Sequence, residues 1–129
     1  MDITVNLEQR HFTCTSVKKG VLYYERTCKR EEPSIYLFYV VVYGREPFIV
    51  DLIETTVLQF SNPDVGIASA LMGFVATMPY DGATPEDARA WVENTIPTLS
   101  GKPGGSKEMV FAGAKYVLNG PPTALTLEM

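Results

Sequence analysis

The residues of this chain with the clearest capacity for chemistry are its two cysteines, Cys14 and Cys28. A bond between them would indicate an oxidising compartment, whereas two free thiols would be compatible with the cytosol. Redox catalysis is disfavoured because the pair does not form a Cys-x-x-Cys motif. The even number of cysteines and their closeness in sequence favour a disulfide, and two buried, unreactive thiols are the alternative.

The turn expected between the cysteines conflicts with that disulfide. Both residues fall on strand-like segments, and Lys18-Lys19-Gly20 between them suits a three-residue hairpin loop. In that register Cys14 lies opposite Tyr24, which leaves Cys28 roughly 13 Å further along the strand. A disulfide needs Cα atoms within about 7 Å of each other. The bridge and the tight turn therefore exclude each other unless a bulge or a longer turn intervenes.

The remaining polar residues do not form a recognisable catalytic or metal-binding group. His11 is the single histidine, and it has no cysteine or acid near it at a spacing typical of such a site. Asp51 and Glu54 lie three residues apart on a predicted strand, so their side chains point to opposite faces. We therefore predict no catalytic residues, no metal and no cofactor. An enzyme whose acids come from loops, for example Asp51 with Asp81, stays open as an alternative.

The elements that must position these residues follow a simple order of strands, two helices and strands. Helices are expected from about 65 to 78 and from Thr84 to about 96, each with a proline near its start. Segments rich in aromatic and β-branched residues predict strands, and the alternation at 3–7 predicts a further short strand or an ordered arm. The predicted strands are 12–17, 21–28, 35–43, 48–60, 109–118 and 124–129.

This order predicts a single α+β domain spanning residues 1–129. We expect two layers, with an antiparallel sheet of about five to six strands. Both helices precede a C-terminal hairpin and pack on one face of the sheet.

The strand predicted at 35–43 is apolar on both faces, which is typical of a central strand covered on both sides. If the helices cover only one face, one alternating set of its side chains has no cover within this chain. Exposed apolar patches mark interfaces or ligand grooves. The candidate interface is Tyr36, Phe38, Val40 and Val42, or the alternating set Ile35, Leu37, Tyr39 and Val41. Strong twist and long loops that wrap this face are the other interpretation.

Small residues share one face of the helix predicted at 65–78. Gly66, Ala70 and Gly73 would let this helix approach its neighbours closely, which is the commoner cause of such a pattern. The alternative is an apolar ligand held between this helix and the sheet.

Composition and charge limit the kinds of partner. A net charge of −4 argues against nucleic acid. The longest apolar runs fall short of the roughly 20 residues that a membrane span needs. The N-terminal residues lack the features of a signal peptide, although a trimmed signal would leave the same sequence.

We therefore predict a non-catalytic, exported or surface-exposed domain that acts through protein–protein contact or self-association, as in a homodimer. A small-molecule binding domain is the alternative function. The expected location is extracytoplasmic, or cytoplasmic if Cys14 and Cys28 are free thiols.

Overall fold

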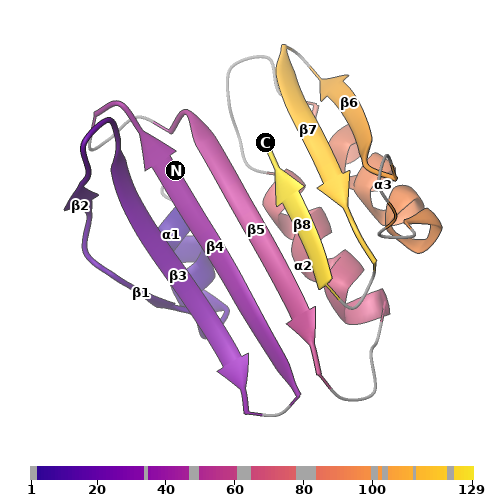
Figure 1. Cartoon of the computed structure of the whole chain (residues 1–129), viewed down its shortest axis with the longest axis horizontal. Coiled ribbons are helices and arrows are strands. Elements are labelled where there is room, and N and C mark those ends of the chain that lie inside the picture. The colour runs from indigo at the N-terminus through magenta and orange to yellow at the C-terminus, as the bar shows by residue number, and fades with distance from the viewer. Residues whose placement is uncertain are drawn as a thin grey trace.

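The fold is an antiparallel sheet with helices packed against one of its faces, which confirms the predicted α+β class (Figure 1). The computed structural model describes residues 3–33, 35–46, 50–60, 65–77, 84–99, 102, 105–111, 113–121 and 124–129, with only the backbone described at 3–5 and 65.

The sheet contains more strands than expected for two reasons. Lys18 and Lys19, in the predicted turn, form a short strand of their own, and the segment predicted as one strand at 109–118 turns back on itself at Gly113, whose φ is 82°. The strands are β1 (Thr13–Cys14), β2 (Lys18–Lys19), β3 (Tyr24–Glu32), β4 (Tyr36–Gly44), β5 (Leu52–Gln59), β6 (Lys107–Phe111), β7 (Ala114–Asn119) and β8 (Ala124–Glu128).

The strand order joins two halves of the chain along one strand pair. The order is β1-β3-β4-β5-β8-β7-β6, and β2 also pairs with β3. The last strand, β8, lies beside β5, and Ile53 and Met129 exchange backbone hydrogen bonds of 2.8 and 3.0 Å at its end. We call the β5–β8 pair the seam. The strands from β1 to β5 form the N-terminal half of the sheet, and β6 to β8 form the C-terminal half.

The first element is a helix, α1 (Ile3–Gln9), so the predicted strand or arm at 3–7 is wrong. The helix ends in the backbone pattern of a Schellman cap: His11 has a φ of 69°, and the Phe12 amide donates to the Leu7 carbonyl at 3.0 Å. Leu7 and Phe12 are both buried, which is the apolar contact that accompanies this cap. The alternation of three apolar residues resembled a strand, but the capped end closes a helical turn.

The two predicted helices are confirmed as α2 (Val65–Ala76) and α3 (Pro85–Thr95), with a 3₁₀ turn at Ile96–Thr98. Pro85 begins α3, while the Thr84 side chain makes no capping hydrogen bond. The expected start of α2 at 62–64 lies outside the described residues. Figure 1 shows α1 behind β3 and β4, and α2 and α3 behind the seam and the C-terminal half.

The core lies between the helices and the sheet. Large side chains from every layer are fully buried there, which is how a two-layer domain removes one face of its sheet from water. Among the described residues, Thr55 on β5 is the one buried polar residue. The largest fully buried side chains are Leu7, Val40, Ile53, Val57, Met72, Val75, Val92, Ile96, Tyr116, Leu118, Leu125 and Leu127.

Candidate functional site

An apolar stripe runs along β4 and β5 on the face of the sheet opposite the helices. Leu37 pairs with Leu58 and Tyr43 pairs with Leu52, so these side chains share that face. The Phe60 amide donates to the Ile35 carbonyl at 2.8 Å, which continues the pairing beyond the strand ends. The open-face stripe consists of Ile35, Leu37, Tyr39, Val41, Tyr43, Leu52, Leu58 and Phe60.

One end of the open-face stripe is its most exposed part. Phe60 is 61 % exposed and Ile35 is 46 % exposed, while the other stripe residues on β4 and β5 are half-buried. No described helix covers this face in Figure 1. The apolar side chains along β4 are therefore left in contact with solvent, while on β5 the polar residues Glu54 and Thr56 separate Leu52 from Leu58.

The first set of candidate interface residues lies on the other, helix-covered face. Phe38 and Val40 are buried in the core, and Tyr36 and Val42 pack against it. Tyr36 stacks on Phe38 with ring centroids 4.3 Å apart. The alternating set, which begins at Ile35, is therefore the set left uncovered. Because both faces of this strand are apolar, the sequence pattern could not decide between them.

Charged residues border the open-face stripe on both sides. On β3, Lys29 lies opposite Tyr39, and its ammonium group lies 3.4 Å from the Glu31 carboxylate. On the other side, Glu54 pairs with Glu128 across the seam. An apolar centre with a polar rim is the usual anatomy of a protein interface.

Tyr43 is the stripe residue whose ionisation is most affected by this border. Partial burial raises the pKa of its phenol, and the negative charges of Glu54 and Glu25 and a hydrogen bond with Glu54 raise it further. The neutral phenol is therefore the form present through the physiological range.

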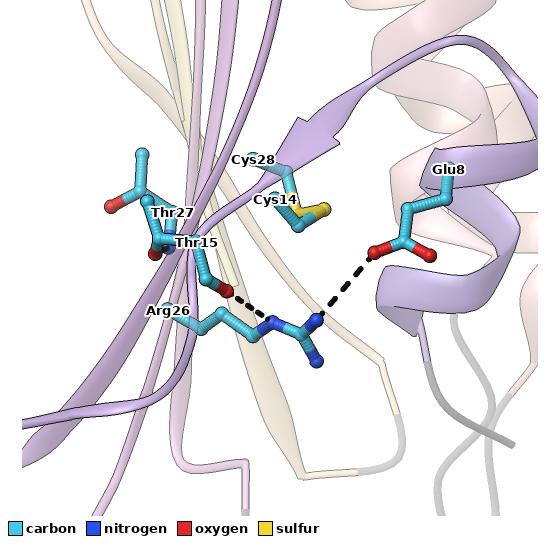
Figure 2. A network of polar contacts seen from close by, with 6 residues as sticks. All are labelled: Glu8, Cys14, Thr15, Arg26, Thr27 and Cys28. Carbon is cyan, nitrogen blue, oxygen red and sulfur yellow. Dashed lines mark hydrogen bonds and ion pairs between the residues drawn. A yellow bond between two sulfur atoms is a disulfide. The ribbon is translucent and has the colours of Figure 1, made fainter.

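The predicted disulfide between Cys14 and Cys28 is present, with an S–S distance of 1.98 Å (Figure 2). The two residues are direct partners in the β1–β3 register. The prediction of a tight turn at Lys18-Lys19-Gly20 is therefore wrong. Lys18 and Lys19 belong to β2, and the chain turns at Val21-Leu22, where the Gly20 amide donates to the Tyr23 carbonyl at 2.7 Å.

A bulge reconciles the bridge with the hairpin. Cys14 pairs with Cys28, but Lys18 pairs with Glu25, so the first strand holds one more residue than β3 between these two pairs. An extra residue on one strand is a β-bulge, which bends the strand without ending its pairing. The sequence gives no clear signal for the position of this bulge.

Polar contacts tie the base of this hairpin to α1 (Figure 2). The Arg26 Nε donates to the Thr15 carbonyl at 2.7 Å, and its Nη2 lies 3.5 Å from Glu8 Oε1. The Thr27 amide donates to Thr15 Oγ1 at 3.2 Å. The disulfide and these contacts hold the base of the hairpin in one orientation.

The small residues of α2 lie in two different environments. Gly66 and Ala70 are exposed. Gly73 is buried against α3: a Cβ atom there would lie 2.8 Å from Glu93 Oε1 and 3.3 Å from Arg89 Cγ. At Gly73 the absence of a side chain therefore allows α3 to approach α2 closely.

No group of three or more His, Cys, Asp and Glu that could hold a metal occurs within the described ranges. Asp51 accepts hydrogen bonds from the Arg45 amide at 2.8 Å and from Arg45 Nε at 3.1 Å. These contacts lower the pKa of Asp51, the backbone bond most strongly. Asp51 is thus engaged in closing a loop, and its proposed partner Asp81 lies outside the described residues.

Comparisons with protein-family models, curated proteins and solved structures found no match for this chain. Of the helices that the structure describes, none has both the length and the apolar character needed to cross a membrane.

Proposed function

We propose that this chain is a non-catalytic, extracytoplasmic domain that acts through protein–protein contact, in the form of self-association, and that the open-face stripe is the contact surface. The observation that carries the proposal is the row of apolar side chains along the uncovered face of β4, which Leu52 and Leu58 on β5 extend at its two ends. A monomer gains no stability from an apolar surface that stays exposed to water, and exposed apolar patches of this kind mark interaction sites.

The composition of the stripe supports a protein partner. It contains Tyr39, Tyr43 and Phe60, and aromatic residues are enriched in the cores of protein interfaces. The stripe is set on two long, paired strands, so binding would require little reordering of the backbone. Charged residues on β3 and at the seam supply the polar rim.

The experiment replaces the apolar character of the stripe without disturbing strand pairing. In the Leu37→Lys, Leu58→Glu double variant, the two new charges lie directly opposite each other and can pair. Sedimentation velocity of the wild type should show a concentration-dependent dimer, and the double variant should remain monomeric. The matched control is Val110→Glu, which introduces a charge opposite Lys115 on the same face but far from the stripe.

Wild-type protein that stays monomeric at every concentration would contradict the proposal. A double variant that associates as strongly as the wild type would place the contact on another surface. Circular dichroism of all three proteins ensures that any change reflects association rather than unfolding.

The extracytoplasmic location is supported by the disulfide, because such bonds persist in oxidising compartments. Intact mass of protein isolated from its native cells under acid quench tests this point. The proposal expects a mass that increases on reduction, whereas the mass of the dithiol form before reduction would contradict it.

A further inference from the structure

The hairpin formed by β2 and β3 ends in an apolar tip that nothing in the described chain covers. Val21 is fully exposed and Leu22 is 78 % exposed. Two-residue hairpin turns normally carry Gly, Asn or Asp, because those residues adopt the required backbone angles easily. Two aliphatic residues at this position contribute nothing to the core and leave their side chains available to an external apolar phase.

Positive charge lies beside the tip. Lys18 and Lys19 form β2, both are exposed, and none of the contacts in the described structure engages their ammonium groups. Glu25 lies opposite Lys18 in the register, while Glu31 and Glu32 lie at the far end of β3. Residues 17–24 therefore carry two positive charges and no acid in a chain whose net charge is −4.

Further residues at the same end of the sheet extend this pattern. Tyr23 follows the tip and is 49 % exposed, and its ring is of the kind that gathers at membrane–water interfaces. Tyr24 pairs with Gly44, which brings the hairpin beside the connection between β4 and β5. Val50 in that connection is also exposed.

The base of the hairpin is fixed, so the tip has a defined orientation. The Cys14–Cys28 disulfide and the contacts of Arg26 with Thr15 and Glu8 join it to the sheet and to α1. A preorganised apolar projection loses little conformational entropy when it binds.

We propose that Val21 and Leu22 insert into the headgroup–acyl boundary of an anionic lipid bilayer while Lys18 and Lys19 bind the anionic headgroups. A convex tip with two aliphatic side chains falls far short of the roughly 800 Å² per partner of a standard protein interface. A bilayer supplies an apolar phase and negative charge together, and both contribute to the binding of surface-seated segments. This surface is separate from the open-face stripe.

The test is co-sedimentation of the full chain with vesicles of phosphatidylcholine alone or mixed equally with phosphatidylglycerol. Binding should be stronger to the anionic vesicles and should fall as salt is added. Val21→Ser with Leu22→Ser should weaken binding by about tenfold or more. Replacing Lys18 and Lys19 with Gln should weaken it by roughly fivefold per lysine. The matched control is Val110→Ser on β6, an exposed aliphatic residue in the other half of the molecule.

The depth of the tip is measured in a second experiment. Leu22→Trp should be quenched by lipids brominated on their acyl chains, whereas Trp91, which contacts Phe111 with ring centroids 6.3 Å apart, should not be quenched in the wild type. Three results would overturn the proposal. The wild type could fail to bind anionic vesicles, it could bind no better than the Val21→Ser, Leu22→Ser variant, or it could bind both vesicle types equally. Tip-dependent capture of a protein without any vesicle binding would also overturn it.

Discussion

In the N-terminal half of the sheet a disulfide and one short helix support the strands, whereas in the C-terminal half two helices pack on each other and on the sheet. Seven of the ten exposed large hydrophobic residues in the described chain lie in the N-terminal half, so that half carries both proposed contact surfaces. The lightly covered half is cross-linked, while the half with more helix needs no cross-link. This is consistent with disulfides compensating for a limited core.

The largest effect on the stability of the N-terminal half is expected from removal of the disulfide. Replacing Cys14 and Cys28 together with Ala should lower the free energy of unfolding by about 3 kcal/mol, because the bond closes a loop with a sequence separation of 14 residues. Urea denaturation measures the loss, and wild type under reductant is the control that should match the variant. An unchanged midpoint would mean that the N-terminal half is held without the bridge.

The C-terminal half should be most sensitive where its helices meet. Gly73→Leu should destabilise the protein by about 1–3 kcal/mol, because the new side chain must displace Arg89 and Glu93 on α3. Ala70→Leu, on an exposed position of the same helix, should stay within about 0.5 kcal/mol of the wild type. Thermal or urea unfolding measures the loss of stability in both variants. Equal stability of the two would show that α2 and α3 are not in close contact at Gly73.

The seam between the halves contains a buried hydroxyl group whose replacement should stabilise the protein. Thr55 is fully buried, and its hydroxyl has no hydrogen-bond partner among the described residues. Thr55→Val keeps the shape and should raise the free energy of unfolding by about 1 kcal/mol. Thr56→Val, the next residue on the open face, is the control and should have little effect. A destabilised Thr55→Val variant would reveal a partner for the hydroxyl.

The smallest expected effect is at the loop that closes with Asp51. Hydrogen bonds from the Arg45 backbone and side chain lower the pKa of Asp51 below its ordinary value of 3.8. A lowered folded-state pKa means that the contact contributes above the ordinary pKa and is lost as the pH falls through the lowered value. Carboxyl NMR titration should show this pKa. Arg45→Ala should raise it only partway, because the backbone amide remains; no change at all would contradict the role of the guanidinium group.

Much of the fold could be predicted because local pattern and tertiary structure agree. The helix at Pro85–Thr95 combines a proline start with an apolar stripe, and the strand at Tyr36–Gly44 is rich in aromatic and β-branched residues. The helix at Ile3–Gln9 could not be recognised, because three alternating apolar residues fit a strand equally well. Its identity depends on the cap at His11, which forms only when Leu7 and Phe12 reach the core.

The interaction surfaces could be predicted only in part, since they depend on which face the helices cover. The sequence indicated an uncovered face on the strand that contains Leu37, but both alternating sets were apolar. The even number of cysteines predicts the disulfide correctly, whereas the preference for glycine in tight turns places the neighbouring turn at the wrong residues. The bulge between Cys14 and Lys18 corrects the register, and it also moves two aliphatic residues to the hairpin tip.

In the proposed dimer, the open-face stripe of the N-terminal half is the contact surface between copies of this chain. Methyl NMR across a concentration series tests it most directly, because leucines occur on both faces of the sheet. We predict that the methyl resonances of Leu37 and Leu58 shift with concentration, while those of the buried Leu118 and Leu125 do not. Spectra that do not change with concentration, or changes confined to the C-terminal half, would contradict the account.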